Sequence, residues 1–372
     1  MPDVFIVSDN ILSPLGITAA ENFAQLKKGI SGVKRHDDPI MSDLPFYAAL
    51  FDKLPDVKGG YTKFEKLLIG SIDNALQDSG IDIRDKRTIL IISSTKGNIS
   101  LLETESYGQA LPGLVALHGS AKSVAGYFGF ANPPITISNA CISGVMAILT
   151  GMRMLRSGQY ENAVIAGADT ISKFVLSGFQ AFQATSSGPC KPFDEARDGI
   201  NLGEGAGTII LSSNQKYAGR LKVLGGSISN DANHLSAPSR TGQELCGAIN
   251  KALGDAHLLP ADIDFISAHG TATVYNDEME AKAITLANLQ SVPLNSLKGY
   301  YGHTLGAAGL IETIISCHSL KENLVLPTLG FENPGVMEPL NICTKLLHAS
   351  LHHCLKTASG FGGCNAALIL GK

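Results

Sequence analysis

Short runs of apolar and β-branched residues alternate along this chain with longer segments whose apolar positions recur at helical spacing. The apolar runs predict strands over residues 88–92, 163–166, 208–211, 221–224, 263–266 and 366–370. The amphipathic segments predict helices over residues 64–77, 144–156, 242–256 and 307–321. Because strands without polar alternation must be buried on both faces, the pattern indicates an α/β protein whose sheets are covered by helices.

The chain also carries a candidate internal boundary. A polar stretch from Ser212 to Lys216 separates two parts of similar length, so we predict an N-terminal half of residues 1–213 and a C-terminal half of residues 214–372. Each half has the length of an ordinary domain. No short-period repeat is evident, which argues against a solenoid.

Composition and charge exclude several classes of protein. With 44% hydrophobic and 17% charged residues, the chain can build a sizeable core, so a disordered protein is excluded. The formal net charge of −4 gives no basic footprint for nucleic acid. Glycine is frequent, at 40 of 372 residues, which indicates several places where the backbone turns tightly or approaches a neighbour closely.

Cysteine usage and the start of the chain suggest a compartment. The first residues predict a strand and lack the basic and apolar regions of a signal peptide. The longest uncharged stretch, residues 123–152, is interrupted by Asn and Pro, so we expect no membrane span. Seven scattered cysteines without a C-x-x-C pair argue against a disulfide framework and a zinc site. We therefore predict a cytoplasmic protein that holds no metal.

The first candidate for chemistry is Cys141, in the sequence ITISNACISG. A β-branched run ends there and a predicted helix begins, so Cys141 would lie at the turn into the helix. Free N–H groups and the positive end of the helix dipole stabilise a thiolate, which is the nucleophilic form of cysteine. By itself the pattern fits a buried structural cysteine better, because buried cysteines are common.

A histidine follows a predicted strand in the sequence SAHGTAT. At the end of a strand His269 can point into a cleft, and the hydroxyls of Thr271 and Thr273 can hold an amide or a phosphate-bearing ligand. In isolation such a histidine is more often a hydrogen-bonded structural residue. Asp277 and Glu280 follow at the i, i+3 spacing of a helix start, where the simplest interpretation is charge at a helix N-terminus.

Two glycine-rich stretches lie further along the chain. In KGYYGHTLGAAG, Lys298 and His303 precede a helix whose small residues allow close packing, and Lys298 by itself would be a solvated charge. In SGFGGCN, three glycines surround Phe361 just before the last strand, which is typical of a bent loop whose amides face a ligand. A dinucleotide-binding interpretation fails because no helix begins at this loop.

A charged block, KPFDEARDG, covers residues 191–199 and precedes GEGAG over residues 203–207. Charges of both signs in an otherwise apolar chain favour an internal ion-pair network that braces a loop. We expect this block to be structural.

Taken together, these blocks resemble the β-ketoacyl-acyl carrier protein synthases of the thiolase-like superfamily, nearest the ketoacyl synthase I and II branch. The resemblance covers nearly the whole chain and keeps the family's order: the cysteine block, P-F-D-x-x-R-D-G with G-E-G-A-G, H-G-T-x-T, K-x-x-x-G-H-x-x-G-A-A-G and G-F-G-G-x-N. Each block alone is weak, whereas five in order are highly specific. They reverse the structural interpretations of Cys141, His269, Lys298 and His303, and they imply an α/β, five-layered αβαβα fold built from two similar halves.

The resemblance implies an acyltransferase that performs a decarboxylative Claisen condensation in fatty-acid or polyketide-like synthesis, including the pigment or aryl polyene type. Cys141 would take an acyl group from a thioester, and its amide and that of Phe361 would form the oxyanion hole. His269 and His303, as neutral imidazoles donating from Nε2, would bind the thioester carbonyl of malonyl carrier protein while decarboxylation produces an enolate. Lys298 would complete the catalytic set.

Other residues receive supporting roles from the resemblance. Glu280 and Asp277 would brace the catalytic residues from behind, and Phe361 would gate the acyl pocket. The residues that would hold the phosphopantetheine arm of the substrate are Thr271, Thr273, Gly362 and Gly363. The resemblance implies no cofactor of the protein's own, because the substrates carry the phosphopantetheine thioester.

The implied partner is an acidic acyl carrier protein, for which the family presents basic residues near the entrance of the site. Lys63 and Lys66, at the start of a predicted helix, are the candidates, although a solvated helix face would look the same. The family is usually homodimeric, and a heterodimer with a related subunit is the alternative.

Some positions depart from the family pattern. Ser359 stands where the family often has Phe, and Cys364 stands where it often has Thr, so the gate loop would be roomier and the acyl chain is left open. One alternative is a non-catalytic chain-length-factor subunit, but such subunits typically lack the nucleophile. Another is a thiolase using a cysteine near the C-terminal glycines, such as Cys364, but the K-x-x-x-G-H and P-F-D-x-x-R-D-G blocks favour a decarboxylative synthase.

Overall fold

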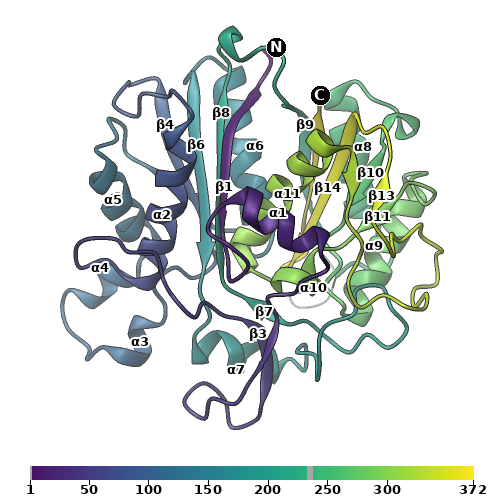
Figure 1. Cartoon of the computed structure of the whole chain (residues 1–372), viewed down its shortest axis with the longest axis horizontal. Coiled ribbons are helices and arrows are strands. Elements are labelled where there is room, and N and C mark those ends of the chain that lie inside the picture. The colour runs from purple at the N-terminus through teal and green to yellow at the C-terminus, as the bar shows by residue number, and fades with distance from the viewer. Residues whose placement is uncertain (1, 233–237) are drawn as a thin grey trace.

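The computed structural model describes residues 2–232 and 238–372, and its central feature is a mixed sheet made of two groups of five strands (Figure 1). The N-terminal group runs in the order β1 (Phe5–Leu12), β8 (Gly205–Ser212), β6 (Asn162–Asp169), β4 (Thr88–Ser93) and β5 (Ile135–Ile137). From the other edge, the C-terminal group runs in the order β11 (Leu294–Asn295), β10 (Phe265–Ser267), β14 (His353–Gly360), β15 (Cys364–Gly371) and β9 (Lys222–Asn230). The groups meet where Phe5 of β1 pairs with Lys222 of β9.

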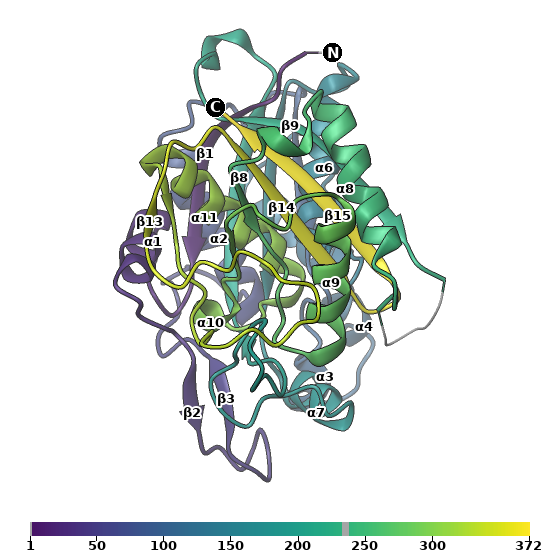
Figure 2. The ribbon, with the colours of Figure 1, turned by 90° about the vertical axis from the view of Figure 1, so that its right-hand side faces the viewer.

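Helices cover both groups of strands and fill the space between them. On the outer face of the N-terminal group lie α2 (Lys63–Gln77) and α5 (Leu117–Phe128). On the outer face of the C-terminal group lie α8 (Gln243–Ala256) and α9 (Val274–Leu286), which stand beside the yellow strands β14 and β15 in Figure 2. Between the groups, α6 (Ser143–Arg156) and α11 (Ala308–Glu322) contact strands of both. This arrangement confirms the predicted five-layered αβαβα fold.

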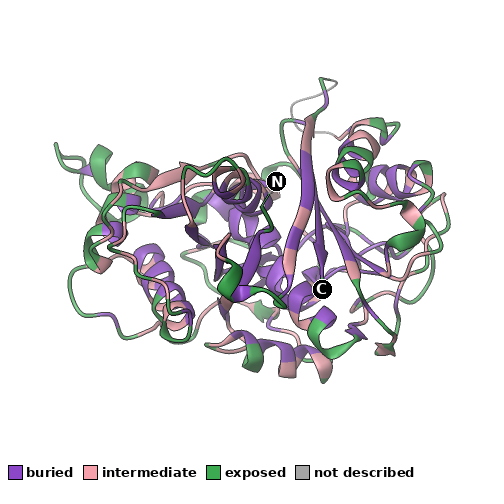
Figure 3. Cartoon of the chain, turned by 90° about the horizontal axis from the view of Figure 1, so that it is seen from above, coloured by how far each residue is buried: buried purple, intermediate pink, exposed green. Residues whose placement is uncertain are grey.

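The apolar core follows the layers, as the buried ribbon at the centre of Figure 3 shows. A central cluster surrounds α6 and α11, and two outer clusters lie under α2 and under α8 with α9. Because α11 lies between two groups of strands, nearly all of its residues are buried. The expected amphipathic face is therefore absent from α11, since a helix enclosed on all sides has no polar face.

The sequence pattern located the main elements closely. The helices α2, α6, α8 and α11 each begin and end within one residue of their predicted bounds. Thr62 caps α2 in a capping box with Glu65, which defines the first turn of that helix. The strand predicted over 263–266 is observed as β10, because Pro260–Asp262 forms a 3-10 turn and pairing with β11 and β14 begins only at Phe265.

Glycine allows α6 and α11 to approach each other closely. A Cβ added at Gly144 would lie 2.6 Å from Leu310 N, and a Cβ added at Gly309 would lie 2.6 Å from a methyl carbon of Val145. Neither space can hold a methyl group without movement of the helices. The close packing predicted for the small residues at the start of α11 is confirmed.

Shorter elements complete the chain. The remaining helices are α1 (Ala19–Lys27), α3 (Leu101–Thr104), α4 (Leu111–Val115), α7 (Lys173–Ala181) and α10 (Lys298–Tyr301). The remaining strands are β2 (Lys34–His36), β3 (Phe46–Ala49) and β7 (Leu202–Gly203) in one small sheet, and β12 (Leu324–Val325) and β13 (Leu347–His348) in another. Within residues 2–232 and 238–372, no helix has the length and apolar character needed to cross a bilayer.

The predicted boundary after residue 213 falls between β8 and β9, that is, between the two groups of strands. The strands of the N-terminal group all precede it, and those of the C-terminal group all follow it. The division of the chain into two domains at this residue stays a prediction.

Candidate active site

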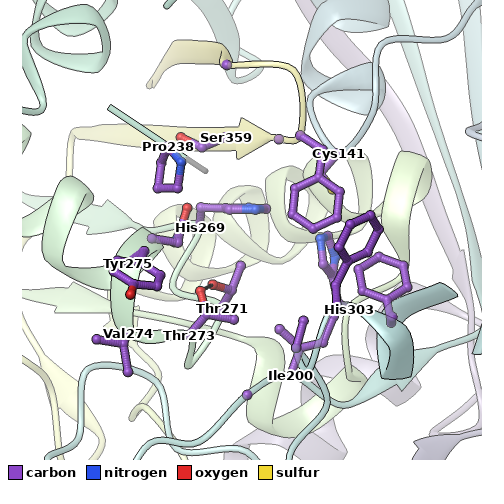
Figure 4. A pocket seen from close by; sticks show the side chains of 18 of the residues that line it. Cys141, Ile200, Pro238, His269, Thr271, Thr273, Val274, Tyr275, His303 and Ser359 are labelled. Carbon is purple, nitrogen blue, oxygen red and sulfur yellow. Dashed lines mark hydrogen bonds between the residues drawn. The ribbon is translucent and has the colours of Figure 1, made fainter. Parts of the chain in front are cut away.

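One pocket brings together three residues that the sequence places at the centre of the chemistry (Figure 4). Cys141, His269 and His303 all line this pocket, which has a volume of about 360 Å³. They come from the turn before α6, the loop after β10 and the loop after α10. The fold thus assembles the pocket from both halves of the chain.

Cys141 lies in a tight turn between β5 and α6. Ala140 has a φ of 44°, a left-handed conformation that is uncommon for a residue with a Cβ, and it turns the chain sharply before the cysteine. Cys141 is only partly exposed, and it lines the pocket. A Cβ added at Gly360 would lie 2.9 Å from Cys141 N, so this glycine allows the C-terminal loop to lie against that amide.

The protonation of Cys141 differs from what its place at a helix start predicts. Burial raises the pKa of the thiol to about 12, Cys364 acts in the same direction, and the positive charge of Lys298 opposes both. Desolvation therefore opposes the stabilisation of a thiolate that we expect from the position of Cys141 at a helix start. The thiol is the resting form at neutral pH.

The rings of His269 and His303 meet edge to face in the pocket. Their centroids are 5.1 Å apart and their planes lie at 79°. Burial lowers the pKa of both rings well below the usual value of 6.5, and the positive charge of Lys298 adds to the effect. Both rings are therefore neutral at physiological pH, in agreement with the imidazole form that the family resemblance implies.

The surroundings of each ring also indicate which nitrogen carries the proton. Nδ1 of His269 and Nδ1 of His303 are buried and have no hydrogen-bond partner among the described residues. A buried N–H without an acceptor is rarer and costlier than a buried acceptor without a donor. We therefore assign the proton of each neutral ring to Nε2, the nitrogen on the other side of the ring.

The same three side chains form the one group in the described part of the chain with the spacing of possible metal ligands. Cys141 Sγ and one nitrogen of each ring all lie within 4.8 Å of one another. Structural zinc takes four protein ligands, and no fourth His, Cys or carboxylate joins this group in the described residues. That the protein holds no metal stays a prediction.

Two buried carboxylates hold the loop that carries His269. Glu280 accepts hydrogen bonds from the amides of His269 and Gly270, each at 2.8 Å. Asp277 accepts a hydrogen bond from the amide of Thr271 at 2.9 Å. Both carboxylates lie in the first turns of α9, so their expected place at a helix start is confirmed, and both are fully buried. Their negative charges face the backbone amides of the loop.

A buried cluster of charges lies behind His269. Lys298 Nζ donates to the carbonyl of His269 at 2.8 Å and forms an ion pair with Glu312 of α11. Lys356 of β14 places its Nζ 2.7 Å from the other oxygen of Glu312. None of these three residues is more than 3% exposed, so the interpretation of Lys298 as a solvated charge is wrong. Sequence reasoning missed Glu312 and Lys356, although each interrupts an apolar segment and could have been noticed for that reason.

The rest of the pocket carries hydroxyls and aromatic rings. Thr271 and Thr273 both line it, and their hydroxyl oxygens are 2.9 Å apart. Phe361 is stacked on Phe179, with centroids 5.8 Å apart, and meets Phe182 edge to face. Sequence reasoning missed Phe179 and Phe182, because aromatic residues in an uncharged helical segment first indicate core.

The glycines of the C-terminal loop occupy different places. Gly363 lines the pocket at a φ of 74°, and a Cβ there would lie 2.5 Å from Asp231 O. Gly362 has a φ of 88° but lies outside the pocket lining, so the structure does not bring it to the site with the other predicted substrate-binding residues. Ser359 lines the pocket and donates a hydrogen bond to Asn365 Oδ1 at 2.8 Å.

Lys63 and Lys66 lie on α2, on the outer side of the N-terminal strands, and not at the pocket. Lys63 Nζ is 2.6 Å from Glu204, whose carboxylate is buried, so Lys63 is not a free surface charge. No Lys or Arg belongs to the pocket lining in the described residues. The docking of a carrier protein at Lys63 and Lys66 stays a prediction.

Residues 191–199 brace their surroundings through backbone hydrogen bonds. Asp194 accepts from two successive amides that begin at Glu332, and Arg197 donates to two backbone carbonyls. Among the described residues, the one ion pair of this block joins Lys191 to Glu332 at 3.9 Å. The predicted ion-pair network is therefore wrong, because the charged groups satisfy backbone groups of neighbouring loops.

Comparison with known proteins decides the family. Residues 39–216 match the N-terminal domain of beta-ketoacyl synthase, and residues 221–332 match its C-terminal domain. The chain belongs to the β-ketoacyl synthase family. It is an acyl-transferring condensing enzyme with a thiolase-like fold, which confirms the family, the fold class and the enzyme class predicted from the sequence blocks.

The β-ketoacyl synthase chain is similar to its relatives over their full lengths. The 3-oxoacyl-[acyl-carrier-protein] synthase 2 of Vibrio cholerae is 29% identical, with 98% of each chain covered. The protein of the same name from Rhizobium meliloti is 28% identical, with 100% of this chain and 99% of the relative covered.

Two solved structures are also similar to this synthase chain. A beta-ketoacyl synthase from Burkholderia phymatum has a TM-score of 0.91 at 26% identity, with 100% of both chains covered. The structure of the ketosynthase ApeO in complex with its chain length factor ApeC, from Xenorhabdus doucetiae, has a TM-score of 0.86 at 26% identity. That match covers 100% of this chain and 98% of the other.

Proposed function

We propose that this chain is a catalytically active β-ketoacyl-acyl carrier protein synthase, which loads an acyl group onto Cys141 and condenses it with malonyl carrier protein. The observation that carries the proposal is the convergence of Cys141 with the neutral rings of His269 and His303 in one pocket. A thiol nucleophile and two neutral N–H donors are the groups that this reaction needs.

In the first half-reaction, Cys141 Sγ attacks the carbonyl carbon of an acyl-phosphopantetheine thioester. A new S–C bond forms, the bond to the pantetheine sulfur breaks, and the thiol proton leaves with that sulfur. Because burial raises the pKa of Cys141 to about 12, loss of this proton accompanies the attack. The amides of Cys141 and Phe361 are the proposed oxyanion donors, which the contact at Gly360 supports by bringing the C-terminal loop against Cys141 N.

In the second half-reaction, the thioester carbonyl oxygen of malonyl carrier protein accepts hydrogen bonds from Nε2–H of His269 and of His303. The bond to the malonyl carboxylate breaks, CO₂ leaves, and the electron pair becomes an enolate whose oxygen both donors hold. The enolate carbon then attacks the carbonyl carbon of the acyl thioester on Cys141. A new C–C bond forms, the bond from the acyl carbon to Cys141 Sγ breaks, and the released sulfur of Cys141 takes up a proton. Neutral rings suit this step, because they stabilise the enolate oxygen without readily giving their proton to the carbanion.

Two other functions are less well supported. A non-catalytic chain-length-factor role does not require Cys141 to share a pocket with two neutral histidines. A thiolase that uses Cys364 is disfavoured, because this residue is buried and lies outside the pocket lining, whereas Cys141 lines the pocket. Its Sγ lies 3.5 Å from Phe361 O and 3.7 Å from Asn139 O, the distances of weak hydrogen bonds within the loops.

We further infer that the enzyme acts as a homodimer that receives its substrates from an acyl carrier protein in the cytoplasm. β5 is the last strand of the sheet, and it pairs with β4 on one side only. Its residues are half-buried. An open strand edge is a ready site for pairing with another chain. We assign this edge to a second copy of the chain, and a related subunit is the alternative that the ApeO–ApeC complex suggests.

The function is tested by incubating the protein with acyl carrier proteins that bear saturated, unsaturated or aryl acyl groups, followed by malonyl carrier protein. Intact mass spectrometry is expected to show an acyl-enzyme in the wild type and in Cys364→Ser but not in Cys141→Ser, and then a β-ketoacyl product. Absence of an acyl-enzyme with every donor would favour the chain-length-factor role, and acylation of Cys364 would favour a thiolase. The preferred donor identifies the pathway, whether primary fatty-acid or polyketide-like.

A further inference from the structure

Lys356 is a buried lysine that has no role in either of the two proposed half-reactions. It is 0% exposed, and it lies on β14, where Cys354 and Ala358 on the same face belong to the central apolar cluster around α6 and α11. An ammonium in such a layer is costly unless it is both paired and hydrogen-bonded. Its contacts therefore indicate what the fold uses it for.

The hydrogen bonds of Lys356 converge on the strand end that leads to a catalytic residue. Its Nζ donates to the carbonyls of Ser267 and Ala268, each at 3.1 Å. The next carbonyl along the chain, that of His269, accepts from Lys298 Nζ at 2.8 Å. Two ammonium groups therefore hold three successive carbonyls of the segment that enters the catalytic loop.

Glu312 joins the two ammonium groups into one unit. One of its oxygens pairs with Lys298, and the other lies 2.7 Å from Lys356 Nζ. Because Glu312 is on α11, the unit connects the central layer to the strand end. Loss of Lys356 would leave Glu312 paired with one cation only. It would also remove the side-chain donor to the buried carbonyls of Ser267 and Ala268.

The opposite side of the loop is held by a negative charge, and β14 takes part there too. Glu280 accepts from the amides of His269 and Gly270, and its Oε1 also accepts from Thr357 Oγ1 at 2.6 Å. Successive residues of a strand point to opposite faces, so Lys356 and Thr357 reach the two sides of this loop. Cations hold its carbonyls, and an anion holds its amides.

We propose that Lys356 is a positioning residue for His269, which it serves by fixing the carbonyls before it and by keeping positive charge behind the catalytic rings. The proposal rests on the proposed function, because it assumes that His269 acts in decarboxylation. Lys356 touches no substrate. Its effect is exerted through the backbone of residues 267–269 and through its charge.

The positive charge of Lys356 lowers the pKa of both histidine rings. Burial is the main cause that lowers the pKa of His269 and His303, and the charges of Lys298 and Lys356 both add to it. The charged groups packed behind the two rings include Lys298 of α10, Lys356 of β14, Glu280 of α9, Glu312 of α11 and, for His303, also Lys96. The carboxylates Asp198 and Asp231 line the pocket that both rings share. Removing one cation raises the pKa of both rings, so protonation of the rings begins at a higher pH.

The test compares the two half-reactions of the full-length protein in Lys356→Met. Malonyl decarboxylation depends on His269, whereas acylation depends on Cys141, so we expect decarboxylation to fall roughly tenfold more than acylation. We also expect the acid limb of the pH profile for decarboxylation to move to higher pH. The matched control is Lys251→Met, at an exposed position of α8, which should leave both half-reactions and the profile unchanged.

A second variant separates the hydrogen bonds from the charge and serves if Lys356→Met does not fold. Lys356→Gln retains a donor for one carbonyl but has no charge, so we expect the same shift of the acid limb with a smaller loss of decarboxylation. Equal losses in both half-reactions with an unmoved pH profile would reduce Lys356 to a structural role and overturn the proposal. If the wild type itself neither acylates nor decarboxylates, it is the proposed function that fails.

Discussion

The three side chains that we propose as catalytic carry no charge at rest. Cys141 is a thiol, and His269 and His303 are neutral rings, because burial opposes the charged form of each. Lys298 and Glu280 stand one layer behind them and face the backbone of the loop that carries His269. Two carboxylates, Asp198 and Asp231, line the pocket itself. The donors of the pocket can thus respond to negative charge that exists only during the reaction, which is the condition for stabilising a transition state more than a ground state.

The resting state of Cys141 can be tested through its alkylation. Since the thiol has a pKa raised to about 12, the thiolate fraction at neutral pH is small and grows with every unit of pH. The rate of iodoacetamide modification should rise about tenfold per pH unit up to the limit of protein stability. Mass spectrometry measures the rate, with Cys141→Ser as the blank. A plateau near pH 7 would reveal a resting thiolate and contradict the expectation.

Replacement of either ring should separate the two half-reactions. In His269→Ala and in His303→Ala we expect condensation to fall by about 10²–10³-fold, because one donor to the enolate oxygen is lost. Acylation of Cys141 should persist, since neither ring provides the nucleophile. Product formation and acyl-enzyme mass are the two measurements. His348→Ala, at an exposed position of β13, is the control, and equal activity of all three variants would refute the assignment.

At the scale of elements, the contact between α6 and α11 connects the turn that carries Cys141 with the loop that carries His303. α6 begins directly after Cys141, and α11 follows the loop that carries His303. Glycines at 144 and 309 let these helices lie closer than a side chain would allow. Helix packing in the central layer therefore sets how far the Cys141 turn lies from the loop that carries His303.

A methyl group at this contact should reduce stability. Gly144→Ala would place a Cβ 2.6 Å from Leu310 N, so we expect the free energy of unfolding to fall by about 1–3 kcal/mol. The control is Gly247→Ala within α8, where a Cβ would meet nothing within 4 Å. There the better helix propensity of alanine should raise the free energy of unfolding by up to about 1 kcal/mol. Urea unfolding measures both, and a neutral Gly144→Ala would show that the helices can separate at little cost.

At the scale of the whole molecule, the two groups of strands enclose α6 and α11, so the catalytic loops of both halves open onto one pocket. The sheet has an open edge at β5, the strand that leads to Cys141. Pairing of a second copy at this edge would place the two nucleophile turns near the dimer interface. The oligomeric state and the geometry of the site would then be connected through one strand.

The dimer can be tested by changing one backbone donor of β5. Ser94 N donates to Ile137 O, so the polar groups of Ile137 face β4, and those of Thr136, one residue away, face the open edge. Thr136→Pro removes an outward N–H and should yield a monomer, whereas Thr136→Val retains it and should remain dimeric. Light scattering measures the mass of each. A monomeric wild type would contradict the proposed interface.

The amino-acid sequence by itself determined the order of the main elements and the bounds of four helices, and it pointed to the three residues that the structure brings together in the pocket. Helices such as α2 appear within one residue of prediction, because their apolar spacing and the capping pair Thr62 and Glu65 are local signals. Cys141, His269 and His303 were found through short blocks whose residues are close neighbours in the chain. Such information does not depend on how distant segments pack.

Only the tertiary structure decided which charges are buried and which protonation states follow. In the sequence Lys298 resembles a solvated charge, and Asp277 and Glu280 resemble charges at a helix start. Packing encloses all three and turns them toward the backbone of one loop. Lys356 contacts this segment from a strand that lies 89 positions away from Ser267 along the chain. Desolvation and Coulomb interaction depend on distances in space, so segments remote in sequence determine the chemistry of the pocket only after folding.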